Sequence, residues 1–118
     1  MKKLALVTGG TRGIGAAISQ KLKKSGYTVV AVYHGNEKVA KTFQKKTGIP
    51  TYKWDVSHFE ECRKGISQVL KEYGSIDVLV NNAGITRDGV LHKMDYNNWN
   101  DVIQTNLTSC FNMCRQVI

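Results

Sequence analysis

Short apolar runs alternate along this chain with stretches in which apolar residues recur at helical spacing. Residues 4–7, 28–33 and 76–80 form short runs rich in valine, leucine and other apolar side chains. Such runs are typical of strands that are buried on both faces of a parallel sheet. Residues 51–54 instead alternate polar and aromatic side chains, which indicates a strand at or near the edge of that sheet.

The stretches between these strands carry helix signals. Gly26 ends a helix that contains Ala16, Ile18 and Leu22, and Gly48 ends a short polar helix over residues 37–47. Residues 57–60 read Ser-His-Phe-Glu, which predicts a capping box at the start of a helix over residues 58–73. The side chains that we expect this helix to turn toward the core are Phe59, Cys62, Ile66, Val69, Leu70 and Tyr73.

A last helix begins near residue 95 and runs toward residue 118. Asn106 interrupts it, because an amide inside a helix competes for backbone hydrogen bonds. The alternation of strands and helices predicts a doubly wound α/β fold of the Rossmann type, with a parallel sheet, right-handed crossovers and helices on both faces. With the strand order third, second, first, fourth, the turns after the first and fourth strands lie side by side.

A glycine-rich loop joins the first strand to the first helix, with Thr8, Gly9, Gly13 and Gly15 at its fixed points. Backbone N–H groups at a helix N-terminus are unpaired and carry positive partial charge, and glycine lets a bulky anion approach them. We therefore predict that a pyrophosphate binds here. The spacing departs from the usual G-x-G-x-x-G, so a plain glycine-rich turn is the alternative.

The second strand is followed by Tyr-His-Gly-Asn at positions 33–36, without the Asp or Glu that usually binds the ribose 2′-hydroxyl of NAD. No carboxylate there repels a 2′-phosphate. Arg12 in the glycine loop, and Lys38 or Lys41 beyond the strand, can supply positive charge to that phosphate. This pattern favours NADP(H) over NAD(H), with His34 either a contact of the nucleotide or an ordinary surface histidine.

Polar residues also follow the third and fourth strands. Asp55 ends the third strand, where it can accept a hydrogen bond from an adenine amino group while Val56 covers the ring; a turn-forming Asp before a helix is the alternative. Asn-Asn-Ala-Gly at 81–84 follows the fourth strand directly, so that Asn82 and its neighbours border the cofactor.

Composition narrows the class of protein. The 118 residues suffice for one modest domain with a net charge of +8. Many of its lysines fall at the ends or outer faces of predicted helices, which we interpret as a solvated basic surface; a field that favours anionic cofactors and substrates is the alternative. No basic motif with interleaved aromatics indicates nucleic-acid binding, and no run approaches the roughly 20 apolar residues of a membrane helix. The three cysteines lack C-x-x-C spacing, so we expect reduced thiols in the cytoplasm, without a disulfide framework or a metal site.

Four motifs occur here in the order found in the classical short-chain dehydrogenases/reductases, which this chain resembles over its whole length. They are the glycine loop, Asp55-Val56, the Asn-Asn-Ala-Gly turn and Asn106 within Thr-Asn-Leu at 105–107. The longer match over residues 84–94, together with Trp99, is similar to bacterial reductases of 3-oxoacyl thioesters. Within that group, residues 52–56 and 111–113 are most similar to the members that act on acetoacetyl-CoA.

The resemblance implies the roles of individual residues. Asn106 matches the asparagine that holds a water in the proton relay, and is our candidate catalytic residue, although an amide whose hydrogen bonds are satisfied in a helix kink is the alternative. Asp88 matches a loop position near the thioester substrate, although a structural pairing with Arg87 is the alternative. The cofactor-binding residues that we predict are Gly9, Thr11, Arg12, Gly13, Ile14, Gly15, His34, Asp55, Val56, Asn82, Ala83 and Gly84.

The resemblance also implies which catalytic groups are not among the 118 residues. Members of the family run to roughly 250 residues, so residues 1–118 correspond to the N-terminal dinucleotide-binding half of one Rossmann-type domain. The serine that binds the carbonyl and the Tyr-x-x-x-Lys pair lie beyond Ile118 in the family. The intact protein is then an NADPH-dependent reductase that forms (R)-3-hydroxybutyryl-CoA for polyhydroxybutyrate synthesis, whereas the 118 residues alone are expected to be inactive.

Two further functions stay open from the sequence. The substrate can be carried by acyl carrier protein instead of coenzyme A, as in fatty-acid synthesis, or the chain can be a non-catalytic nucleotide-binding half domain. The family implies a cytoplasmic homotetramer. A partner, a swapped copy or a remainder of the chain is expected to cover the open edge of the fourth strand and the apolar residues Leu107, Phe111, Met113, Val117 and Ile118.

Overall fold

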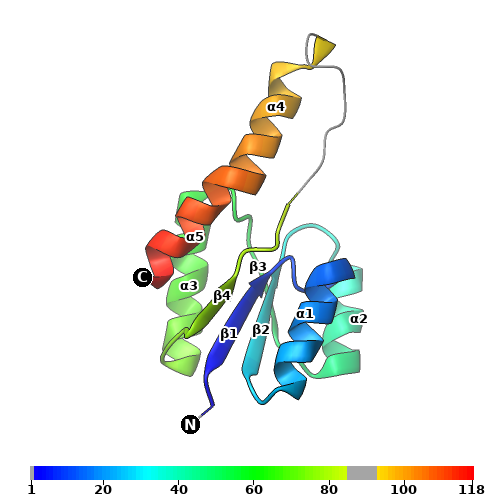
Figure 1. The fold of residues 1–118 in the computed structure, drawn as a ribbon, viewed down its shortest axis with the longest axis vertical. Coiled ribbons are helices and arrows are strands. Elements are labelled where there is room, and N and C mark those ends of the chain that lie inside the picture. Colours follow the sequence, from blue (N-terminus) through cyan, green and yellow to red (C-terminus); the bar gives the residue numbers. More distant parts are fainter. Residues whose placement is uncertain (1, 85–92) are drawn as a thin grey trace.

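A computed structural model describes residues 2–84 and 93–118 of the chain. Its sheet consists of β1 (Leu4–Thr8), β2 (Thr28–Tyr33), β3 (Thr51–Lys53) and β4 (Val78–Val80). All the paired strands are parallel, and their order is β3-β2-β1-β4 (Figure 1). The predicted fold class and strand order are therefore confirmed.

Helices cover both faces of this sheet. On one face lie α1 (Gly13–Lys24) and α2 (Glu37–Thr47), and on the other lie α3 (Phe59–Tyr73) and α5 (Ser109–Val117) (Figure 1). α5 continues a longer helical rod that begins with α4 (Tyr96–Ile103) and passes through the π-helix η2 (Gln104–Thr108). In Figure 1 α4 extends past the carboxyl ends of the strands, so this rod stands beside the edge where ligands bind in such sheets.

Alternate residues of each central strand enter different cores. Leu4 and Leu6 pack on the α3–α5 side with Met113, whereas Ala5 and Val7 pack on the α1–α2 side with Phe43. All five residues of β1 are buried. This burial on both faces is why the strand is an uninterrupted apolar run, as the sequence pattern predicts.

The capping box predicted at residues 57–60 is wrong. His58 is the residue that precedes α3, and Ser57 lies one position too early to cap the helix. The backbone N–H and the hydroxyl of Ser57 donate instead to Oδ1 of Asp55, at 2.9 and 2.7 Å. Glu60 pairs with Arg63 rather than with the backbone. The turn is therefore built around the Asp55 carboxylate, which competes successfully for the groups of Ser57.

The apolar stripe of α3 is also displaced from the predicted one. Cys62, Ile66 and Val69 are buried, but Phe59, Leu70 and Tyr73 are 40%, 39% and 36% exposed. The helix approaches the sheet through Gly65, where an added Cβ would lie 2.1 Å from Cε3 of Trp54. The buried side of α3 is therefore the side that carries Gly65. Phe59 and Leu70 lie at the edge of this side, and Tyr73 is the last residue of the helix.

The end of the helical rod is covered only in part. Met113 is fully buried and Val117 is partly buried against the core, so the expectation that Met113 needs a partner or a further segment to cover it is wrong. Leu107, Phe111 and Ile118 are exposed, as are Tyr96 and Trp99. Within residues 2–84 and 93–118, every helix is too short or too polar to cross a membrane.

Candidate functional site

The turns after β1 and β4 meet at neighbouring strand ends. The Thr8 hydroxyl accepts hydrogen bonds from the backbone N–H groups of Asn82 and Ala83, both at 3.0 Å. It also lies 3.3 Å from the carbonyl oxygen of Val80. The Asn82 side chain donates to the Gly9 carbonyl at 3.1 Å. The glycine loop and the Asn-Asn-Ala-Gly turn thus form one continuous surface.

Two glycines make this close approach possible. Gly9 has a φ of 61°, a left-handed conformation that favours glycine. At Gly15 a Cβ would lie 1.9 Å from the Gly9 carbonyl oxygen and 2.6 Å from Nδ2 of Asn82. The Gly15 backbone therefore packs directly against the Gly9 backbone. Gly15 supports the loop in this way but does not line the cleft.

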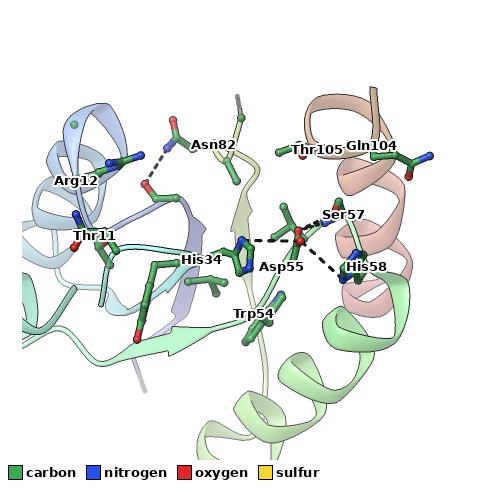
Figure 2. Close-up of a pocket in the computed structure, with 18 of the residues that line it drawn as sticks. Thr11, Arg12, His34, Trp54, Asp55, Ser57, His58, Asn82, Gln104 and Thr105 are labelled. Carbon is green, nitrogen blue, oxygen red and sulfur yellow. Dashed lines mark hydrogen bonds and ion pairs between the residues drawn. The ribbon is translucent and has the colours of Figure 1, made fainter. Parts of the chain in front are cut away.

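The N-terminus of α1 opens onto this surface. Arg12 precedes the helix in an extended conformation, no side chain among the residues that the structure describes caps the helix, and its first turn holds no acidic residue. Uncapped N–H groups at a helix start attract an anion. The exposed Arg12 side chain adds a full positive charge beside them (Figure 2).

A cleft of about 630 Å³ runs from the glycine loop across the ends of β2 and β3 to α4 and η2 (Figure 2). Most of the predicted cofactor-binding residues line it: Gly9, Thr11, Arg12, Gly13, His34, Asp55, Val56, Asn82, Ala83 and Gly84. The cleft therefore brings together side chains from four separate strand ends, although their roles toward a cofactor stay predictions.

Asp55 lies at the centre of this wall, with its two oxygens in different surroundings. Oδ1 accepts the two hydrogen bonds from Ser57, whereas Oδ2 faces His34 Nδ1 at 3.9 Å and His58 Nδ1 at 3.8 Å (Figure 2). Burial acts to raise the pKa of the Asp55 carboxyl, but the hydrogen bonds from Ser57 and the attraction of the two histidines outweigh it and lower that pKa. Asp55 is thus an ionised acceptor facing the cleft.

His58 is tied to α3 as well as to Asp55. Its Nδ1 lies 2.6 Å from Oε2 of Glu61, whose other oxygen accepts the backbone N–H of Asp55 at 3.0 Å. The hydrogen bond with Glu61, and then the attraction of Asp55, raise the pKa of His58. Glu61 therefore braces both the backbone of Asp55 and the imidazole beside its carboxylate.

Several predicted residues lie away from the cleft. Ile14, with 76% of its surface exposed, is not a lining residue, and neither Lys38 nor Lys41 belongs to the lining. Asn106 is not a lining residue either, yet a Cβ on Gly84 would lie 3.2 Å from its Oδ1, so its amide adjoins the end of the turn after β4. Asp88 lies outside the described residues.

Asn106 occupies the middle of η2, so the predicted interruption of the last helix is a π-helical turn. An extra residue per turn of this kind is often found at functional sites. On the same stretch Gln104 and Thr105 line the cleft, as does Asp101 at the end of α4. These residues were not predicted from the sequence, although they precede Asn106 by less than two turns.

Other contributors to the site were missed as well. Trp54, which precedes Asp55, is buried and lines the cleft, and its ring lies where a side chain on Gly65 would stand. Asn112 of α5, itself buried, donates from Nδ2 to the Val56 carbonyl at 3.0 Å and so fixes the turn after β3. Their local patterns, an aromatic at a strand end and an amide in a helix, carry no distinctive signal.

Cys62 is buried among structural contacts. Burial raises the pKa of the Cys62 thiol to about 11, and its Sγ lies 3.5 Å from the Val56 carbonyl oxygen. Such a thiol is a poor nucleophile at neutral pH. Within the part of the chain that the structure describes, no three His, Cys, Asp or Glu side chains are placed to hold a metal ion.

Comparison with known proteins identifies the class. Residues 3–118 match the short chain dehydrogenase family, and the chain belongs to that family. The fold agrees with this: an actinorhodin polyketide ketoreductase solved with NADPH superimposes with a TM-score of 0.92 at 36% identity, covering 98% of this chain and 46% of the ketoreductase.

Within the family the chain is similar to reductases of 3-oxoacyl thioesters. It is 59% identical over 117 residues to an acetoacetyl-CoA reductase of Paracoccus denitrificans, covering 99% of this chain and 48% of the relative. A 3-oxoacyl-acyl-carrier-protein reductase of Staphylococcus epidermidis is 41% identical over 122 residues, with 99% and 50% covered. The chain thus spans about half the length of the curated relatives it matches.

Proposed function

We propose that the whole protein carrying this chain reduces acetoacetyl-CoA to (R)-3-hydroxybutyryl-CoA with NADPH. One structural observation carries the nucleotide part of this proposal: Thr8 and Asn82 join the glycine loop to the turn after β4 at the mouth of one cleft. The substrate part rests on the 59% identity with acetoacetyl-CoA reductases, compared with 41% for the carrier-protein enzyme.

The residues present fit a dinucleotide. The uncapped start of α1 and the backbone of Gly9 and Gly13 suit a pyrophosphate, and Arg12 suits the additional 2′-phosphate. Asp55 offers a carboxylate oxygen toward an adenine amino group, with Val56 beneath. NADPH, when bound, supplies the hydride.

The chemical step also needs an ordered proton supply. We assign to Asn106 the water-holding role of its counterpart in the family, and to Asp88 a place near the thioester. No tyrosine among the 118 residues is followed by a lysine four positions later. We therefore place the proton-donating Tyr-x-x-x-Lys pair outside them, and we expect the 118-residue chain alone to be inactive.

The setting of the protein follows from the same proposal. Reduction of acetoacetyl-CoA suits a cytoplasmic enzyme that supplies polyhydroxybutyrate synthesis. The homotetramer implied by the family resemblance would cover the exposed apolar residues of α4 and α5.

The test is oxidation of NADPH by the purified whole protein when acetoacetyl-CoA is added. We expect turnover with NADPH to exceed turnover with NADH, and no turnover by the 118-residue chain at equal concentration. The variant Asn106→Ala is expected to lose most of the rate while it still binds NADPH. A whole protein that binds NADPH and leaves acetoacetyl-CoA unreduced contradicts the proposed substrate.

The main alternative is that acyl carrier protein carries the acyl group, which the 41% identity with the relative from Staphylococcus epidermidis supports, although less than the 59% supports coenzyme A. A competition between acetoacetyl-CoA and an acetoacetyl-acyl-carrier-protein distinguishes the two substrates. If the chain is instead a non-catalytic half domain, the 118 residues must bind NADPH by themselves. A fluorescence titration without saturation excludes that function.

A further inference from the structure

His34 and His58 lie on either side of the Asp55 carboxylate, and we call these three residues the histidine bracket (Figure 2). His34 follows the end of β2, and His58 precedes α3, so two separate loops supply the imidazoles. Their side chains are 58% and 62% exposed, which leaves both open to solvent and to a ligand in the cleft. Histidine is the side chain whose charge changes near physiological pH.

The two imidazoles of the bracket have different charged contacts. His58 contacts two carboxylates, Asp55 and Glu61, which offset its charge when it is protonated. Among the described residues, the charged contact of His34 is Asp55 at 3.9 Å. Two other charged residues line the cleft, Arg12 of the glycine loop and Asp101 of α4. The exposed Glu37–Lys53 pair, joined at 2.6 Å, connects the residues that follow His34 to those that precede Asp55 along the chain.

We propose that His34 makes the choice between NADP(H) and NAD(H) depend on pH, an inference that rests on the proposed function. In folds of this type the residue at the end of the second strand lies at the 2′ position of the adenosine ribose. A protonated imidazole there attracts the 2′-phosphate of NADP(H), which NAD(H) lacks, and a neutral imidazole does not.

The other charges of the cleft do not have this effect. Arg12 keeps its charge at every accessible pH, so it supplies the constant part of the preference. Asp55 and His58 border the adenine side, which is the same in both nucleotides. Their titration changes the two affinities together and cancels from the ratio. The pH dependence of the ratio is thus assigned to His34.

The experiment measures the dissociation constants of NADPH and NADH for the whole protein, by nucleotide fluorescence, at about pH 8.5 and about pH 6.5. The lower value keeps most of the charge on the 2′-phosphate, whose second pKa is about 6. We expect the NADPH preference to rise about threefold to fivefold at the lower pH, the size of a partly exposed charge pair. His34→Asn should remove most of this rise, and the matched variant His58→Asn should keep it.

The outcomes separate this inference from the function on which it rests. If both nucleotides bind but the ratio stays constant, or rises equally in His34→Asn, the role of His34 is overturned and the proposed function stands. If neither nucleotide binds, the proposed function itself fails. NADH affinity serves as the folding check for each variant, and His34→Gln replaces His34→Asn if the latter does not fold.

Discussion

One buried hydroxyl holds together the two turns that form the nucleotide cleft. Thr8 is 1% exposed, and its oxygen accepts two backbone N–H groups from the turn after β4. A serine or threonine side chain can do this because one oxygen has two acceptor positions and one proton to donate. The approach of the Asn82 amide to Gly9 then follows from the position of that turn.

Replacing Thr8 with valine tests this link. Thr8→Val keeps the shape but leaves the N–H groups of Asn82 and Ala83 without their acceptor, which should lower the free energy of unfolding by about 1–3 kcal/mol. NADPH should also bind more weakly, because the turn is no longer fixed beside the glycine loop. Denaturant unfolding and NADPH titration of the whole protein measure the two effects.

The matched control is Thr8→Ser, which keeps the hydroxyl and removes only the methyl group. It should retain most of the affinity for NADPH. Equal loss of affinity in both variants would show that packing of the methyl group, and not the hydrogen bonds, positions the turn.

Single site residues are predictable from the sequence where backbone geometry restricts which residue type can occupy a position. They are not predictable where two groups compete for the same hydrogen-bonding partner. The glycine loop and Asp55 follow from strand ends, and both line the cleft. Ser57 satisfies the local pattern of a capping box, but its hydroxyl donates to the Asp55 carboxylate at 2.7 Å, and no sequence rule ranks this partner against the helix backbone. The contact of His58 with Asp55 depends on the same turn and was missed for the same reason.

At the scale of elements, α3 is positioned by a glycine and an aromatic ring. Gly65 faces the Trp54 ring, so the helix axis lies closer to the sheet than a residue with a side chain allows. The same helix carries Glu61 and follows His58, which both brace Asp55. The position of α3 therefore affects the adenosine end of the cleft.

Gly65→Ala should move this helix. The added Cβ would lie 2.1 Å from the Trp54 ring, so either the ring or the helix must shift, at a cost of about 1–3 kcal/mol for overpacking. Urea unfolding of the whole protein gives the change in stability, and tryptophan fluorescence reports the surroundings of the ring. Ser67→Ala, at an exposed position of the same helix, is the control and should change neither value.

If Gly65→Ala proved as stable as Ser67→Ala with unchanged fluorescence, the close packing of α3 on Trp54 would be contradicted.

The buried side of α3 is predictable from the sequence only in part. Helical periodicity places Phe59 and Leu70 near the buried stripe of α3. Gly65 lets the helix pack closer to the sheet on its own side, so the residues that are buried are those around Gly65. The interruption at Asn106 is predictable from its amide, while its π-helical form is not.

At the scale of the whole molecule, strand order and layers are predictable because buried parallel strands have a strong apolar pattern and short connections. What covers the outer surfaces is not encoded in that local pattern. β4 lies at one end of the sheet, and the exposed residues Leu107, Phe111 and Ile118 belong to the rod beside it. Phe111 stacks on Phe59 of α3 with ring centroids 6.3 Å apart, so the apolar surface extends over two helices.

We predict that the 118-residue chain in isolation associates with itself through this surface. Contiguous exposed apolar side chains are typical of sites covered by another polypeptide, and an open strand edge adds unpaired backbone groups. The double variant Leu107→Gln/Phe111→Gln should therefore shift the chain toward the monomer, as measured by sedimentation velocity over a range of concentrations.

The control substitution is Ile14→Gln, because Ile14 is also an exposed apolar residue, 76% accessible, at the start of α1 on the opposite side of the sheet. If association needs only exposed apolar area, this control weakens it as much as the double variant does. If association needs the surface around Leu107 and Phe111, the control leaves it unchanged. A chain that is monomeric at every concentration and unfolds cooperatively would contradict the prediction, since the exposed groups would then need no partner.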